Sequence, residues 1–308
     1  MLVAPHWQAN LPLAGVVVAL GLYVLGGRRL ARAAGPHRRA SQRWRAVGFV
    51  SALAAVVVAL QPPLDSLVGV FLWAHMVQHL LLIGVAAPLM VAAAPWFQVW
   101  RGLPLGWRRG LARTVVTGRW SAPLRAVARF LGRPGEAWLV FTLSLLAWHV
   151  PWLYDLALRN QVVHDLEHLS FLGFAILFWA MVIDTPPFRS PLTQLQRVGF
   201  LLGAMVVSWV LALVLVFSAV PIYSYYAAVA TTPHLVAGTL VFTDPGGLTA
   251  LADQELAGGI MWVPGSIPFS VGIFVFLYRW LDDGRPAVRA REEADPGLPG
   301  RSSHLGGA

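Results

Sequence analysis

Long apolar runs separated by short polar segments dominate the chain. A helix that crosses a membrane needs about 20 mostly apolar residues, because each residue adds about 1.5 Å across a hydrocarbon core about 30 Å thick. The pattern therefore predicts an all-α fold, a polytopic membrane helix bundle with seven transmembrane helices. The expected spans are residues 11–27, 46–60, 68–94, 137–154, 162–183, 198–220 and 257–280.

Arginines fall into alternate connections between these spans. Residues 28–45 carry seven arginines and residues 95–136 carry eight, whereas residues 61–67 and 221–256 carry none. Loops rich in positive charge stay on the cytoplasmic side. Twenty-two of the 23 arginines fit one topology, Arg159 being the exception. We therefore expect the N-terminus outside and the C-terminus in the cytoplasm.

Three segments need separate treatment. The arginines follow the first apolar run, so we expect this run to stay as a span and not to be cleaved as a signal peptide. Residues 227–242 are apolar but too few to span, and we expect an outer re-entrant or interfacial helix there. Residues 283–308 are rich in Gly, Pro, Arg and Glu. We expect a disordered cytoplasmic tail after a membrane domain of residues 1–282.

Composition supports the membrane prediction and excludes several functions. Hydrophobic residues make up 57% of the chain and charged residues 12%, too few to cover a soluble protein. The net charge of +9 lies in the loops, so membrane lipid is the expected partner and nucleic acid is not. The absence of cysteine excludes thiolate metal sites, and the absence of lysine excludes a retinal Schiff base. No motif predicts an enzyme.

Histidines gather on one side of the predicted bilayer. Ionisable side chains at membrane depth are costly and mark functional sites. His75 and His79, like His164 and His168, are four residues apart, so each pair shares one face of a helix. His149 lies where the fourth span reaches the outer side. The five histidines are therefore candidate ligands of one metal ion.

The type of ligand narrows the choice of metal but leaves alternatives open. Imidazole without thiolate suits copper, zinc, iron or nickel, and a thioether would favour Cu(I). Haem can also take axial histidines from facing helices. A lone histidine in a membrane more often bonds to a neighbouring helix, which would leave a metal-free structural role. Further candidate ligands or supporting residues are Met76, Asp155, Asp165, Glu167, His234, Asp253 and Met261.

Three motifs resemble one family, the CtaG-type (Caa3-CtaG) cytochrome c oxidase assembly proteins. The first is HMVQHLLL at 75–82, followed by APL at 87–89. The second is WHVPWLYDLAL at 148–158, with HDLEHLSF at 164–171 and FW at 178–179. The third is DQELAGGIMWVPG at 253–265. Together the motifs cover about residues 70–265 in the family's order.

This resemblance implies a function in assembling a haem–copper oxidase at the cell (cytoplasmic) membrane. It implies copper delivery to the oxidase, without catalysis, and places the five histidines above, together with Asp253 and Met261, in the family's motifs. The implied partners are cytochrome c oxidase subunits and a copper donor on the outer side. Two alternatives remain, a haem-binding redox or haem-transfer protein and an assembly scaffold without metal.

Overall fold

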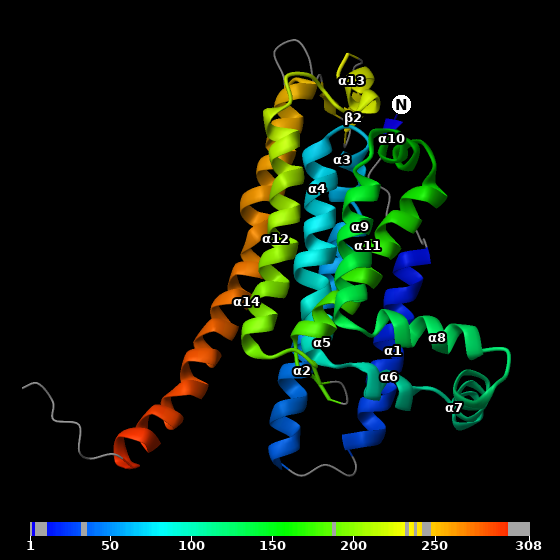
Figure 1. Ribbon diagram of the computed structural model, residues 1–308. Helices are drawn as coiled ribbons and strands as arrows, with labels where there is room; N and C mark the ends of the chain where they lie inside the picture. Colours follow the sequence, from blue (N-terminus) through cyan, green and yellow to red (C-terminus); the bar gives the residue numbers. More distant parts are fainter. Residues whose placement is uncertain are drawn as a thin grey trace, which may run out of the picture.

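The computed structural model describes residues 2–3, 11–31, 36–186, 189–231, 234–236, 239–241 and 248–294. Long helices run side by side, and shorter elements cap both ends of the bundle (Figure 1). The α-helices are α1 (Leu11–Ala31), α2 (Pro36–Leu60), α3 (Leu64–Val68), α4 (Leu72–Leu80), α5 (Ala87–Ala93), α6 (Trp96–Gly102), α7 (Leu105–Ala112), α8 (Ala122–Leu131), α9 (Pro134–Trp148), α10 (Pro151–Arg159), α11 (Gln161–Val182), α12 (Gln194–Phe217), α13 (Ser224–Val229) and α14 (Ala250–Ala294). Two π-helical segments are η1 (Leu81–Ala86) and η2 (Arg113–Thr117). Three short strands, β1 (Leu2–Val3), β2 (His234–Val236) and β3 (Thr239–Val241), pair in that order.

Most of the long helices have the length and composition of membrane spans. Among the described residues, six segments meet both requirements: Pro12–Leu30, Gln42–Val68, Leu72–Ala93, Gln161–Val182, Gln194–Phe217 and Ala250–Asp283. The pair α9 and α10, bent by 75°, gives a seventh span if it is counted as one. Each of the seven predicted spans overlaps one of these segments. The chain is a helical, multi-pass membrane protein.

The helix predicted over residues 227–242 is wrong for most of the residues that the structure describes in this segment. Only α13 is helical here, and it ends at Val229, while β2 and β3 are strands. The Thr231-Thr232-Pro233 sequence that follows α13 disfavours a helix, because threonine is β-branched and proline has no N–H to donate. The rest of this segment lies outside the described residues.

The C-terminal helix is longer than the sequence pattern predicts. α14 has 45 residues and continues to Ala294, so the tail predicted from residue 283 begins inside a helix. Alanine, arginine and glutamate recur between residues 287 and 294, and all three have high helix propensity. Residues 295–308 lie outside the described residues.

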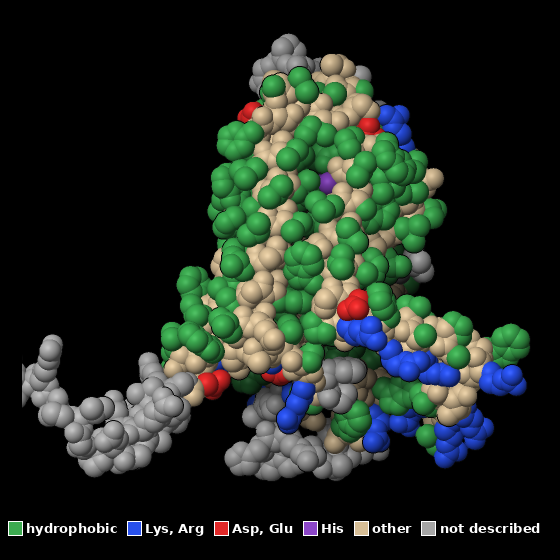
Figure 2. Space-filling view, in the orientation of Figure 1, with side chains coloured by type: hydrophobic (Ala, Val, Ile, Leu, Met, Phe, Trp, Pro, Cys, Tyr) green, Lys and Arg blue, Asp and Glu red, His purple; other side chains and the backbone are tan. Residues whose placement is uncertain are grey.

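Apolar side chains cover the middle of the bundle on the face seen in Figure 2. Large aliphatic and aromatic side chains project outward from α1, α9, α12 and α14 and are largely exposed. They include Val17, Leu139, Leu143, Val206, Val210, Val263 and Phe274. Continuous exposed apolar surface of this kind marks a lipid-facing or protein-binding surface. Arginines lie mainly below this band, around α6 to α8 (Figure 2).

The third span lies at the centre of the bundle. α4 packs against α14, α2 and α3 and continues through η1 into α5, against which α2 and α11 pack. Gly84 in η1 permits the contact with α14, because a Cβ at this position would lie 2.9 Å from Cγ of Pro268. Segments of π-helix inside a longer helix occur often at functional sites. Here η1 directly follows the turn that carries His79.

A buried arginine is paired at the end of α11 that is distant from its histidines. Arg197 Nη1 lies 2.7 Å from Asp184 Oδ2. Burial raises the pKa of Asp184, but hydrogen bonds from Arg197 and Ser190 outweigh it and hold the pKa below the ordinary 3.8. A depressed folded-state pKa adds stability above the unfolded-state pKa, and this stability is lost as the pH falls through the folded-state value.

We expect Asp184→Asn to lower the free energy of unfolding at neutral pH by on the order of 1 kcal/mol, since Asp184 is 44% exposed. The difference from the parent chain should shrink on acidification below the ordinary pKa of 3.8. Thermal unfolding in detergent at several pH values measures it. A difference that stays constant in acid would contradict the ion pair.

Candidate metal centre

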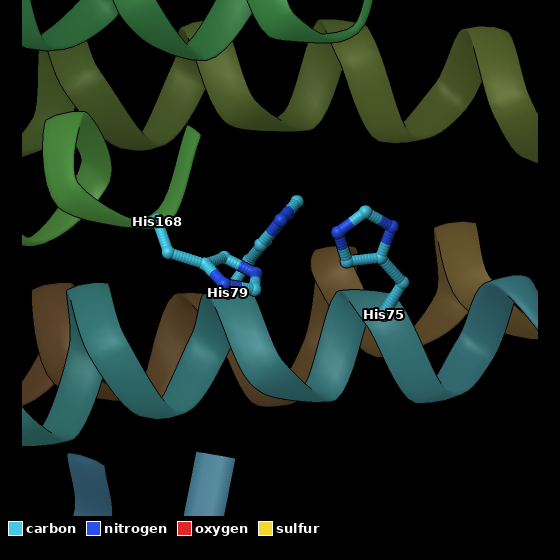
Figure 3. Close-up of side chains that lie close together, drawn as sticks. All are labelled: His75, His79 and His168. Atoms are coloured by element: carbon cyan, nitrogen blue, oxygen red, sulfur yellow. The ribbon is translucent and has the colours of Figure 1, made fainter. Parts of the chain in front are cut away.

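The five predicted histidines lie together and are buried. His75 and His79 come from α4, His164 and His168 from α11, and His149 from the junction of α9 and α10. Ring centroids are 4.3 Å apart for His75–His79, 4.2 Å for His164–His168, 5.1 Å for His75–His164 and 6.1 Å for His79–His149. Figure 3 shows the rings of His75, His79 and His168 between α4 and α11. Each of the five residues is at most 9% exposed.

The local sequence explains where α11 places His164 and His168. The side chain of Asn160 accepts hydrogen bonds from the N–H groups of Val162 and Val163, which caps the N-terminus of the helix. His164 and His168 consequently lie in its first two turns, on the face toward α4.

His149 depends on the break between α9 and α10. Val150 is extended, as residues before proline usually are, and Pro151 starts α10. The Nδ1 atom of His149 lies 2.7 Å from the carbonyl oxygen of Leu145. A carbonyl only accepts hydrogen bonds, so Nδ1 carries the proton and Nε2 keeps its lone pair. In this tautomer Nε2 of His149 can bind a metal.

Glu167 lies at the centre of the cluster. Its carboxylate is fully buried, with one oxygen 3.5 Å from His75 Nε2 and the other 3.4 Å from His79 Nε2. From the sequence we expected Glu167 to be a further ligand or a supporting residue. The spacing of His164, Glu167 and His168 indicates that the three side chains lie together, because residues three and four apart share a helical face.

Many polar atoms of the cluster lack hydrogen-bond partners. They are Nε2 of His75, His149, His164 and His168, both ring nitrogens of His79, and both carboxylate oxygens of Glu167. Leaving a buried donor or acceptor unsatisfied costs about 1–3 kcal/mol, so such atoms are rare unless something binds them. A cation at this point would satisfy several of them at once.

Two sets of donors are close enough to hold one ion. The ligand atoms of His75, His79 and His168 lie within 4.8 Å of one another, and so do those of His75, His164 and Glu167. Both sets share His75, so they form one connected cluster. The residues present therefore fit a metal bound by imidazole and carboxylate.

Tyr154 is a member of the site that the sequence pattern did not reveal. Its hydroxyl lies 2.6 Å from Nδ1 of His75, and its ring stacks on Tyr223 with centroids 4.1 Å apart. Such a partner orients the histidine ring and leaves Nε2 directed at the cluster. Tyr154 reaches the site because α10 folds back at the break, which no helical periodicity predicts.

Three predicted carboxylates serve other contacts. Asp155 accepts hydrogen bonds from the Ser224 hydroxyl and from the Tyr225 N–H, which join α10 to α13. Asp165 accepts a hydrogen bond from Gln161 at the surface. Asp253 bonds to backbone N–H groups of α4 and not to the histidines.

The other predicted residues differ in position. Met76 and Met261 line a cavity beside His79 and His149. His234 has a described backbone in β2, but its side chain lies outside the described residues.

Asp253 caps the helix that carries the first histidine pair. Its oxygens accept hydrogen bonds from the N–H groups of Leu72 at 2.6 Å and Trp73 at 3.0 Å. These N–H groups have no partner within α4, because they belong to its first turn. We expect Asp253→Ala to lower the free energy of unfolding by about 2–4 kcal/mol. Asp253→Asn keeps one acceptor oxygen and should lose about half as much. Thermal unfolding in detergent measures both variants, and an unchanged alanine variant would contradict the cap.

The fold and this site define a multi-pass membrane protein with a buried histidine–carboxylate cluster. The cytochrome c oxidase caa3 assembly factor family (Caa3_CtaG) matches residues 21–283, and the chain belongs to this family. The resemblance seen in the three motifs is thereby confirmed.

The relatives that this chain matches are longer than the chain itself. The uncharacterized proteins Mb0105 of Mycobacterium bovis and MT0111 of Mycobacterium tuberculosis are each 26% identical to it over 293 residues. The aligned part covers 92% of this chain but 40% of those proteins, so the chain spans less than half of their length. No solved structure matches the chain.

Proposed function

We propose that the chain is a cytochrome c oxidase assembly factor that binds copper in the histidine–carboxylate cluster and delivers it to the oxidase. The observation that carries the proposal is the convergence of unpartnered, buried imidazole and carboxylate atoms from α4, α11 and the α9–α10 junction. Family membership supplies the oxidase as the partner. Copper is cargo in this proposal, so the chain needs no catalytic group.

The donor set supports copper. Nitrogen and oxygen donors bind Cu²⁺ more tightly than they bind the other divalent ions of the first transition row. The tautomer of His149 leaves its Nε2 available, and Nε2 of His75 is buried without a hydrogen-bond partner. A single ion also fits the space better than haem, because the rings pack directly against one another. The adjoining cavity of about 50 Å³ is far smaller than the roughly 300 Å³ or more of pockets for larger ligands.

We further propose that the end of the bundle with α3, α10 and α13 faces the outer side of the cytoplasmic membrane. In Figure 2 most of the visible arginines lie at the opposite end, which the positive-inside rule assigns to the cytoplasm. The histidines would then receive copper from a donor in the outer compartment. The exposed arginines around α6 to α8 would contact anionic lipid.

Metal analysis of the purified protein tests the proposal. We expect copper to co-purify or to bind on addition, with no Soret band. Deletion of the gene should lower oxidase activity, and excess copper in the medium should restore it in part. Protein that binds neither Cu(I) nor Cu(II) would overturn the copper function. A normal oxidase in the deletion strain would overturn the role in assembly.

A further inference from the structure

A cavity of about 50 Å³ adjoins the histidine–carboxylate cluster on the side away from α11. It lies between α4, η1, α9, α12 and α14, and apolar residues form most of its wall. Four of the lining residues can bind a metal, namely Met76, His79, His149 and Met261. Figure 2 shows one histidine side chain between the apolar side chains that cover α12 and α9. The helices around the cavity include α9, α12 and α14, which carry exposed apolar side chains on their outer faces.

The donors in this cavity differ from those of the cluster. Among the described residues that line it there is no carboxylate, while two thioethers are present. The Nε2 atom of His149 and both ring nitrogens of His79 are buried without hydrogen-bond partners. His149 and His79 are only 5% and 4% exposed. Thioether and imidazole without carboxylate select Cu(I) over harder cations.

We propose that Met76, Met261 and His149, together with His79, form a second site that takes Cu(I) and passes it sideways between α9 and α12. This inference rests on the proposed copper function and adds an exit from the cluster. His79 belongs to both sites, since its ring centroid lies 5.7 Å from that of His168 and 6.1 Å from that of His149. An ion can therefore move between the sites without leaving the protein. The receiver is a membrane protein that packs against α9 and α12, and no electron is transferred in the step.

Copper K-edge X-ray absorption of the purified full chain, loaded anaerobically with Cu(I) and ascorbate, tests the site without any substitution. We expect sulfur as well as nitrogen neighbours of the copper. The matched variants are Met76→Leu with Met261→Leu, and Met205→Leu as the control, since Met205 is buried in α12 outside this cavity. The double variant should lose the sulfur signal and bind Cu(I) at least about tenfold more weakly in a chelator competition, while Met205→Leu should not change. Cu(II) binding should persist in both, because the cluster keeps its histidines and Glu167.

The outcomes separate the two proposals. A parent chain that binds no copper in either oxidation state overturns the copper function and the second site together. Copper with nitrogen neighbours only, or equal Cu(I) affinity in the double variant and the control, overturns the second site alone. Sulfur neighbours that disappear in the double variant support it.

Discussion

Replacing His75, His79, His164 and His168 together by alanine is expected to abolish Cu(II) binding. These residues supply four of the five buried imidazoles. His75, His79 and His168 form one donor set within 4.8 Å, and His75 and His164 are two of the three members of the other. Loss of groups that only support a metal ligand already weakens binding about 10- to 100-fold, so loss of the ligands themselves should exceed this. Metal analysis and titration calorimetry with Cu(II) measure the effect.

The alanine substitutions also remove buried volume, so a packing control is needed. A quadruple glutamine variant keeps more of that volume and a polar group, but it removes every imidazole of the two pairs. We expect it to bind no Cu(II) either, with a smaller loss of thermal stability. Copper binding equal to that of the parent chain in the glutamine variant would contradict the site. Normal oxidase assembly with either variant would instead favour a scaffold without metal.

The second large effect is expected for Glu167→Gln. This change should weaken metal binding, while the stability of the metal-free protein should stay the same or rise. The change removes a negative ligand from the donor set that contains His75 and His164. We expect Cu(II) affinity to fall by more than the roughly 10- to 100-fold that loss of a supporting group costs. The metal-free protein should be as stable as the parent or more stable, because a neutral amide is cheaper to bury than a carboxylate without hydrogen bonds.

Asp165→Asn is the matched control for Glu167→Gln. Asp165 lies on the same helix, two residues away, but bonds to Gln161 at the surface. It should change neither copper affinity nor the melting temperature. Glu167→Gln that lowers stability while leaving copper affinity intact would show that the carboxylate serves packing and not metal binding.

Local periodicity explains why much of the site could be predicted from the sequence. Histidines four residues apart share a face of any helix, so the two pairs needed only the correct spans. Glu167 shares the face of His164 and His168, which is why the sequence already offered it as a further ligand or supporting residue. Tyr154 could not be predicted in this way, because it reaches His75 through the break at Pro151. That contact joins residues 79 positions apart.

Roles that depend on packing between distant segments were also missed. Asp253 is a candidate ligand by residue type, but in the folded chain it caps α4, 181 residues away from Leu72. The spans followed from apolar length, which is a local property. The structure of segment 227–242 could not be predicted in this way, since apolar composition alone cannot separate a short helix from short strands.

The cap on α4 has a consequence for the order in which the site is completed during synthesis. Ribosomes make the chain from its N-terminus, so all five histidines and Glu167 precede Asp253 by more than 80 residues. Until α14 is inserted, the first turn of α4 lacks the acceptor for two of its N–H groups. A nascent chain that ends before Asp253 thus holds every residue of the cluster without the group that fixes the start of its central helix. Metal loading is therefore expected to follow insertion of the last span.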